Sequence, residues 1–216
     1  MSCTLINSNC TDPVLSLDNI ILQRNEKHID GAQWIYDHSQ RKTVYGMQYA
    51  TSVISGNEGI FLLSTELKTD DSKINLQIDT IKKAIDAGLR FSKVVFDSWY
   101  FSSKLVKFLE SMGKDYVSEA KSNRTVCIDG KWITLRDYAY TLDLKSMKSY
   151  TVNGKTYFMK AITTRMKNAG IVKVIVSRGI NSLKFFVTNS SVKVKTIIGK
   201  YLRRWDIEVF HEELKQ

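Results

Sequence analysis

Apolar and β-branched residues come in short runs along the first half of the chain, and their spacing predicts strands. The run VLSLDNIIL at 14–22 follows Pro13 and precedes a polar segment, which is typical of a strand. Two further runs, at 43–55 and 58–68, flank a Gly-Asn pair. Because Gly-Asn suits a tight connection, these two runs are predicted to form a hairpin.

The pattern then alternates between helix and strand. Four isoleucines recur at helical spacing within 70–89, and Gly88 marks the stop of this helix. The segment SKVVFDSWYFSS predicts a short buried strand that ends near Asp97, and 103–113 predicts a helix closed by its final glycine. Residues 115–123 return as a strand. This order predicts an α/β fold, a mixed sheet with helices packed on it.

From about 125 to 190 the pattern changes to short strands separated by turns, and IDGKW and VNGK are strong hairpin signals. We interpret this segment as a β-strand-rich insertion. The segment from about 191 to 216 is predicted to be helical. The predicted organisation is one domain over 14–216 that carries the insertion, preceded by an N-terminal remnant at 1–13.

The composition is that of an ordinary globular protein, with 216 residues, 43% hydrophobic and 25% charged. No apolar run approaches the ~20 residues of a membrane span, and the N-terminus lacks the features of a signal peptide. A cytoplasmic protein without a membrane partner is therefore expected. Cys3, Cys10 and Cys127 are odd in number and irregularly spaced, so neither a disulfide framework nor a cysteine metal site is predicted.

The net charge of +10 is unevenly distributed. Residues 1–120 carry 13 lysines and arginines against 15 acidic residues, whereas 121–216 carry 19 against 7. Between Asp143 and Asp206 no acidic residue occurs, while 14 lysines and arginines do. This favours a polyanionic partner, most commonly nucleic acid. An acidic membrane surface is the rival, but no strongly amphipathic basic helix supports it.

Two aspartates occupy unusual positions in the predicted strands. Asp18 lies in the middle of the first strand, where burying a charge is costly without a partner. Asp97 ends an apolar strand, a place where functional side chains gather in α/β sheets. Structural alternatives exist for both: Asp18 could cap a turn with Asn19, and Asp97 could N-cap the following helix.

The final segment, YLRRWDIEVFHEELKQ, concentrates polar side chains on one side if it is a single helix. At about 100° per residue, Tyr201, Arg204, Glu208 and Lys215 share a face about 60° wide. A surface ladder of ion pairs is the alternative, but it leaves the tyrosine unexplained. The neighbouring apolar stripe is predicted to dock the helix on a core. Its members are Ile198, Leu202, Trp205 and Val209.

These segments resemble one family. YLRRWDIEVFHEELKQ matches the Tyr-x2-Arg-x3-Glu-x6-Lys signature of the DDE transposases of bacterial and archaeal insertion sequences. VVFDSWYFSSKLVKFLESMGKDYVSEAKSNR is similar to the segment around their second catalytic aspartate, and KHIDGAQWIYDHSQRK to the stretch after the first. The resemblance covers nearly all of 14–216. It implies a ribonuclease H-like fold whose β-rich insertion lies between the second aspartate and the glutamate.

The resemblance also implies a metal site. Carried over by position, the catalytic and metal-binding residues are Asp18, Asp97 and Glu208. Their carboxylates suit Mg²⁺ or Mn²⁺. Two such ions ~3.5–4 Å apart can activate a water or a 3′-hydroxyl and stabilise the leaving oxygen. The family's first motif is commonly Asp-x-Thr, and here Ile20 stands in place of the threonine.

The remaining candidate residues concern DNA. The candidate DNA-binding residues are Tyr201, Arg204, Lys215, Lys121 and Arg124. Trp99 or Trp205 could stack on an unpaired base, but core packing is the preferred interpretation for both.

The expected function is that of a DNA transposase catalytic domain in a truncated copy, which cleaves phosphodiesters and transfers strands at transposon ends with Mg²⁺ or Mn²⁺. The partners would be the transposon ends and target DNA, with a homodimer on paired ends. An inactive DNA-binding remnant and a stand-alone metal-dependent nuclease of the same fold remain alternatives.

Overall fold

The computed structural model describes residues 12–25, 28–152, 154–179 and 181–214, and the chain forms two compact units. The first unit combines Met1–Ser92 with Arg203–Gln216, and the second is Lys93–Leu202. Of the predicted N-terminal remnant, residues 1–11 lie outside the described residues. No helix in the described part of the chain is long and apolar enough to cross a membrane.

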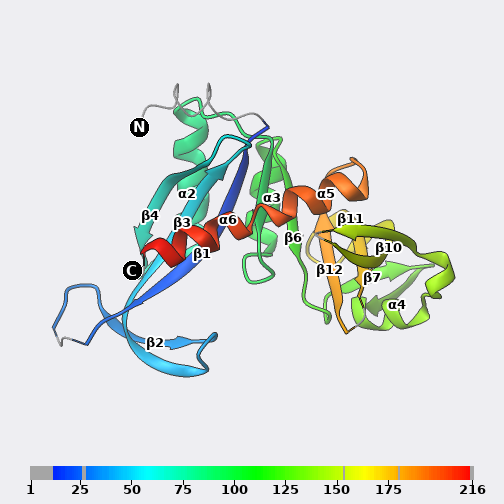
Figure 1. The fold of residues 1–216 in the computed structure, drawn as a ribbon, viewed down its shortest axis with the longest axis horizontal. Coiled ribbons are helices and arrows are strands. Elements are labelled where there is room, and N and C mark those ends of the chain that lie inside the picture. Colours follow the sequence, from blue (N-terminus) through cyan, green and yellow to red (C-terminus); the bar gives the residue numbers. More distant parts are fainter. Residues whose placement is uncertain (1–11, 26–27, 153, 180, 215–216) are drawn as a thin grey trace. The chain divides into compact units, whose positions relative to one another are not determined.

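The first unit is built on an antiparallel sheet (Figure 1). Strand β1 (Val14–Gln23) pairs with one side of the long β3 (Lys42–Ser55), while β2 (Gln33–Asp37) and β4 (Ile60–Leu67) share its other side. The last six residues of β3 are all buried, so both faces of this stretch are covered. Helix α2 (Lys73–Asp86) contacts β3 and β4, and helix α6 (Trp205–Leu214) contacts β1 and β3.

Helix α2 ends where the sequence predicts, and a serine caps its start. The Ser72 side chain accepts a hydrogen bond from the Asn75 amide at the N-terminus, and Gly88 adopts a positive φ of 77° just after the last turn. Its buried Gln77 ties the helix to the sheet, since Nε2 donates to the carbonyl oxygens of Thr51 (3.0 Å) and Asp18 (3.4 Å). The helix therefore supports the backbone of β1 at Asp18.

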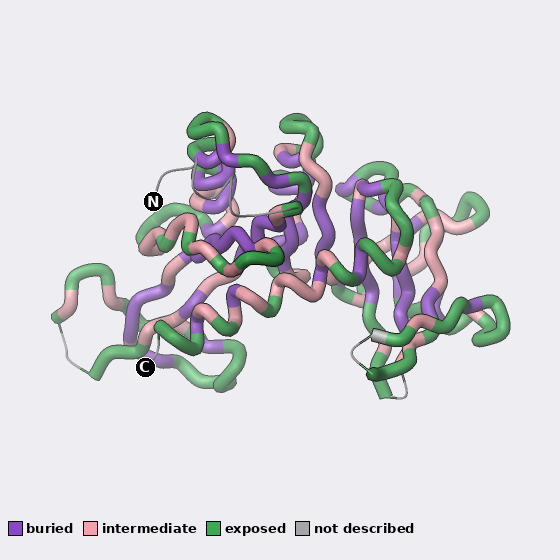
Figure 2. The backbone as a smooth tube through the Cα atoms, turned by 45° about the horizontal axis from the view of Figure 1, so that its top comes forward, coloured by how far each residue is buried: buried purple, intermediate pink, exposed green. Residues whose placement is uncertain are grey.

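The second unit contains a parallel pair followed by an antiparallel region. Strands β5 (Lys93–Phe96) and β6 (Asp115–Glu119) run parallel and are connected through α3 (Ser103–Ser111), while α5 (Val194–Leu202) contacts both strands. In spatial order the strands are β5 (Lys93–Phe96), β6 (Asp115–Glu119), β12 (Leu183–Thr188), β11 (Gly170–Arg178), β10 (Lys155–Met166), β7 (Thr125–Ile128) and β8 (Lys131–Thr134). Strand β9 (Lys148–Val152) also pairs with β10. Figure 2 shows buried residues concentrated along strands and exposed ones along connections.

The predicted hairpins are present, but one helix was missed. Asp129 and Gly130 both have positive φ, at 47° and 80°, as a two-residue connection between β7 and β8 requires. Helix α4 (Leu135–Thr141) follows β8, and a short 3₁₀ turn spans Leu144–Ser146. The Thr134 hydroxyl accepts from the Asp137 amide, so a Thr-x-x-Asp capping pattern was the available signal for α4.

The mixed α/β class is confirmed, but the single C-terminal helix is wrong. The segment divides into α5 and α6, with a turn at Arg203 and Arg204. The Ser16 hydroxyl donates to the carbonyl oxygen of Arg203 (3.3 Å), and the Asp206 amide donates to the same oxygen (3.1 Å), which closes a four-residue turn. Since a side chain has entered the helical hydrogen-bond ladder, the helix is interrupted there.

This interruption changes which side of the last helix is buried. Helix α6 docks through Ile207, which is fully buried, and His211. Trp205 and Val209 are instead 53% and 49% exposed, so the predicted docking stripe is wrong at these two positions. A single-helix projection across the turn misplaces them because the turn resets the direction in which later side chains point.

Candidate carboxylate site and basic pocket

Asp18 lies inside the regular part of β1, opposite Thr51 of β3. Its side chain is 19% exposed. One carboxylate oxygen, Oδ1, accepts a hydrogen bond from the Asn19 amide (2.8 Å). Because the ladder between β1 and β3 continues on both sides of Asp18, this bond does not make a turn cap. The alternative that Asp18 caps a turn with Asn19 is therefore wrong.

Arg204 connects Asp18 to Glu208. Its Nη1 lies 3.6 Å from Asp18 Oδ2, and its Nη2 lies 2.6 Å from Glu208 Oε1. The side chains of Arg204 and Glu208 are 12% and 34% exposed, so the group lies at the edge of the protein interior. Glu208 belongs to the first turn of α6, and Arg204 precedes that helix. The first unit thus brings two of the three predicted carboxylates to opposite sides of one guanidinium.

The two residues that follow Asp18 each have a structural role. Asn19 Oδ1 accepts a hydrogen bond from Nζ of the buried Lys73 on α2 (3.0 Å). Ile20, which replaces the usual threonine of the family motif, is buried in the apolar core. The side chain at this position therefore contributes to packing.

Asp97 comes directly after β5, in the second unit. Its Oδ1 accepts hydrogen bonds from the amides of Trp99 (2.9 Å) and Tyr100 (3.3 Å). Helix α3 is N-capped by Ser102, so the N-cap alternative for Asp97 is wrong. Both bonds fall on one carboxylate oxygen and fix the orientation of the side chain at the end of the strand.

The chemistry of the first-unit pair suits a divalent cation. Carboxylate oxygens are the hard donors that Mg²⁺ and Mn²⁺ prefer, and Asp18 and Glu208 already hold a cationic group between them. Within the described ranges, no three His, Cys, Asp or Glu side chains are grouped so that they could hold a metal ion. Asp97 belongs to the other unit, and the complete triad remains a prediction.

The other signature residues have separate environments. Tyr201 is buried at the end of α5, where its hydroxyl lies 3.4 Å from Glu119 Oε2 and its ring lies edge-on to Phe186. Arg204 belongs to the first unit, so the shared helix face predicted for these two residues is wrong. Lys215 lies outside the described residues.

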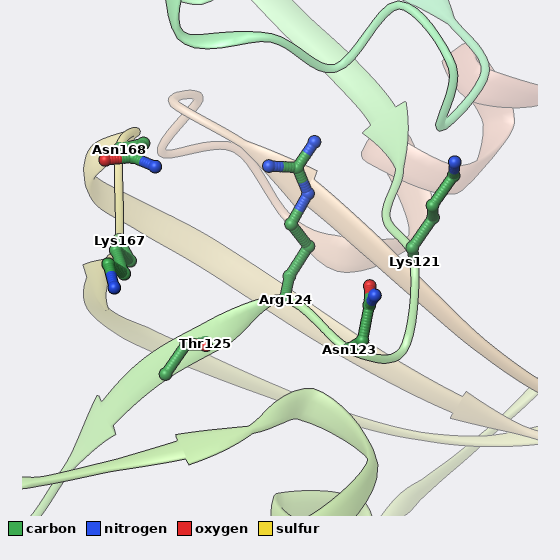
Figure 3. Close-up of a pocket in the computed structure, with 6 residues that line it drawn as sticks. All are labelled: Lys121, Asn123, Arg124, Thr125, Lys167 and Asn168. Atoms are coloured by element: carbon green, nitrogen blue, oxygen red, sulfur yellow. The ribbon is translucent and has the colours of Figure 1, made fainter.

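Lys121 and Arg124 line a pocket of about 420 Å³ in the second unit (Figure 3). Phe101 fixes the orientation of the Arg124 side chain. The guanidinium lies 5.1 Å from the Phe101 ring, and Nη2 donates to the Phe101 carbonyl oxygen. The lining is polar and contains three cations and no carboxylate. Its residues are Lys121, Asn123, Arg124, Thr125, Lys167 and Asn168.

Sequence patterns did not single out Lys167 and Asn168. They occupy the turn between β10 and β11, where Asn168 has a positive φ of 66°. The Lys167 amide donates to the Thr125 carbonyl oxygen (2.9 Å), and Met166 pairs with Val126. This long-range strand pairing brings the turn beside Arg124. The only signal in the sequence was that Lys167 falls within the stretch without acidic residues.

Both tryptophans near the candidate residues are partly exposed. Trp99 follows Asp97 and is 49% exposed, and Trp205 is 53% exposed beside Arg204, whose guanidinium lies 5.4 Å from its ring. The preference for core packing is wrong for both. Trp99 lies in a turn and Trp205 on the outer side of α6, so neither position faces a packed layer.

Comparisons with known proteins give one family and a distant structural similarity. A family model described as "Transposase DDE domain" matches residues 10–216. A solved structure, the Drosophila P element transposase strand transfer complex, is similar with 13% sequence identity and a TM-score of 0.30. That match covers 65% of this chain and 37% of the other, so this chain spans well under half of that protein's length. No curated protein matches.

Proposed function

The chain belongs to the transposase DDE domain family, and from this premise we propose that it is the catalytic domain of an insertion-sequence transposase with the Tyr-x2-Arg-x3-Glu-x6-Lys signature. The proposed reaction is metal-dependent cleavage and strand transfer at transposon ends. The observation that carries the proposal is the meeting of Asp18, from the first strand, with Glu208, from the last helix, around one cationic group.

We assign Asp18, Asp97 and Glu208 as the metal ligands. Mg²⁺ or Mn²⁺, when bound, supplies Lewis-acid stabilisation of phosphate oxygens and activates an attacking hydroxyl. Asp18 is presented by a strand whose backbone Gln77 supports, and Asp97 is oriented by two amides at the end of β5. Ligands held by rigid elements need little reorganisation when a cation arrives.

The basic pocket is the proposed contact for the DNA backbone. Lys121, Arg124 and Lys167 line it, and its lining contains no acidic residue. A phosphate diester is an anion that such a set of cations binds through charge-assisted hydrogen bonds. Because phosphate contacts fix the register of a protein on a duplex, we assign the pocket to positioning DNA. Binding to paired transposon ends and target DNA, as a homodimer, completes the proposal.

The direct test is Mn²⁺ binding to the full chain, measured by electron paramagnetic resonance with Asp97→Asn as the variant. We expect its Mn²⁺ affinity to fall at least about tenfold, the scale on which even outer partners of a metal ligand act. Glu110→Gln, an exposed carboxylate on α3 of the same unit, is the matched control and should bind as the unchanged chain does. Equal affinities in all three proteins would eliminate Asp97 as a ligand and with it the triad.

A further inference from the structure

Arg204 contacts one oxygen of each of the two carboxylates that the first unit contributes to the proposed metal site. Its guanidinium contacts Asp18 Oδ2 and Glu208 Oε1, while Asp18 Oδ1 accepts from the Asn19 amide. We propose that Arg204 is a built-in counter-cation that competes with the divalent metal for this carboxylate pair and is displaced when the metal binds. This inference rests on the proposed function of the site.

Electrostatics explains why the pair needs a resident cation. Asp18 comes from β1 and Glu208 from α6, and docking α6 on β1 brings their negative charges to one place. At 19% and 34% exposure, water screens these charges only in part. A guanidinium presents several donors in a planar fork, so one arginine can contact both carboxylates. Arg204 therefore allows the last helix to dock before any metal is present.

The same geometry makes the arginine and the metal mutually exclusive. Asp18 and Glu208, which would hold the ion, already engage one oxygen each with Arg204, and a divalent ion between these carboxylates would repel the guanidinium. Beside Arg204, the half-exposed Trp205 offers an alternative support, because the guanidinium already lies 5.4 Å from its ring. A cation over an aromatic face stays favourable when it moves toward solvent.

Displacement from the carboxylates would make Arg204 available to bind DNA. Once released from the carboxylates, its guanidinium can pair with a phosphate of the DNA, for which its planar fork is well suited. Metal loading of the carboxylates and phosphate binding by Arg204 are thus coupled steps. An arginine still held by Asp18 and Glu208 offers fewer donors to DNA.

The test compares Arg204→Gln with Arg203→Gln in the full chain by Mn²⁺ titration followed by electron paramagnetic resonance. Both variants lose one positive charge at adjacent positions, but Arg203 donates to Asn57 on the exposed surface and contacts neither carboxylate. We expect Arg204→Gln to bind Mn²⁺ about tenfold more tightly, and Arg203→Gln to change by less than about twofold. In EDTA, Arg204→Gln should have a lower Tm than the unchanged chain, and Mn²⁺ should restore it.

Each outcome distinguishes the inference from the proposed function. Mn²⁺ binding to the unchanged chain, with equal affinity in both arginine variants, overturns the inference and leaves the proposed function standing. Absence of Mn²⁺ binding in every protein overturns both. Arg204→Lys is the second variant if the glutamine variant does not fold. It keeps the charge but cannot bridge two carboxylates, so tighter Mn²⁺ binding than in the unchanged chain is expected and weaker binding counts against the inference.

Discussion

The two units of the chain differ sharply in charge. The first carries 12 lysines and arginines against 15 acidic residues, a net charge of −3, and the second carries 20 against 7, a net charge of +13. The first holds Asp18 and Glu208 with Arg204 between them, whereas the second holds the basic pocket. The sign of the charge therefore follows the proposed tasks: the first unit supplies two of the three proposed metal ligands, and the second supplies the phosphate-binding pocket.

The difference also shows in how the charges are paired. In the second unit, described carboxylates such as Asp115 and Glu119 form ion pairs with Lys93 and Lys184. The excess of 13 cations over carboxylates in this unit cannot be neutralised within it. A surface of this kind is available to a polyanion, and its affinity depends strongly on salt.

The largest expected effect is on the free energy of unfolding, through the packing of α6 on the first unit. Ile207→Ala removes a fully buried side chain and should lower the free energy of unfolding by about 2–5 kcal/mol. Because α6 carries Glu208, Mn²⁺ affinity should also fall, while the salt dependence of DNA binding should stay the same. Urea unfolding and Mn²⁺ titration measure the first two quantities.

Val209→Ala is the control for this prediction. It lies on the same helix but is 49% exposed, so the expected change in unfolding free energy is within about 0.5 kcal/mol. A larger cost for Val209→Ala than for Ile207→Ala would mean that α6 docks through the opposite face.

A smaller effect is expected in the second unit. The double variant Lys121→Gln/Lys167→Gln removes two cations of the basic pocket and should weaken DNA binding about tenfold at moderate salt. For each phosphate that the variant no longer neutralises, the slope of log affinity against log salt should become shallower by about 0.9. Fluorescence anisotropy with a DNA duplex over a salt series measures both.

The matched control removes two cations from the first unit. Lys82→Gln/Lys83→Gln changes the charge by the same amount on the exposed side of α2. Its salt slope should equal that of the unchanged chain, and Mn²⁺ binding should be the same in both double variants. An equal reduction of slope in the two double variants would show that only net charge matters and would remove the distinction between the units.

The smallest expected effect concerns Asp115 of the second unit. Burial alone would raise the pKa of Asp115, but hydrogen bonds from Lys93 and Ser190 and the charge of Lys93 outweigh it, and the pKa is lowered. This contribution to stability is therefore present above about pH 4, the range of an ordinary aspartate, and is lost as the pH falls through the lowered pKa. With 38% of the side chain exposed, it should amount to less than about 1 kcal/mol.

Asp115→Asn should accordingly be less stable than the unchanged chain at pH 7, with the difference narrowing below about pH 4. Urea unfolding across this pH range measures it. A difference that widens in acid would contradict the assigned sign. Asp79→Asn removes a carboxylate from an exposed pair with Lys82. This variant is the control, and its free energy of unfolding should differ little from that of the unchanged chain at pH 7.

Local features of the fold were predictable because their causes lie within a few residues. The Asp129-Gly130 turn and the stop at Gly88 each follow from local backbone preferences. The place of Asp18 within a strand followed from the apolar residues on either side of it, and the place of Asp97 at the end of a strand followed from the apolar run before it. The family match over 10–216 agrees with the DDE transposase family that the resemblance named.

The features that sequence patterns missed depend on distant partners. The turn at Arg203 is stabilised by the hydroxyl of Ser16, so helical periodicity had no means of locating it. Lys167 reaches Arg124 only because β10 pairs with β7. The bridge from Arg204 to Asp18 likewise requires α6 to dock on β1. In each case the deciding contact is long-range, and a pattern within one window does not contain it.

The contact between Ser16 and Arg203 also has a consequence for synthesis. The two residues are separated by 187 positions. At about 5–20 residues per second, the ribosome completes Arg203 roughly 10–40 s after Ser16. During that interval β1 has been made, but neither α6 nor the arginine beside Asp18 exists. The first unit is formed by two segments far apart in the sequence, so its carboxylate site cannot form until Arg204 and Glu208 have been synthesised.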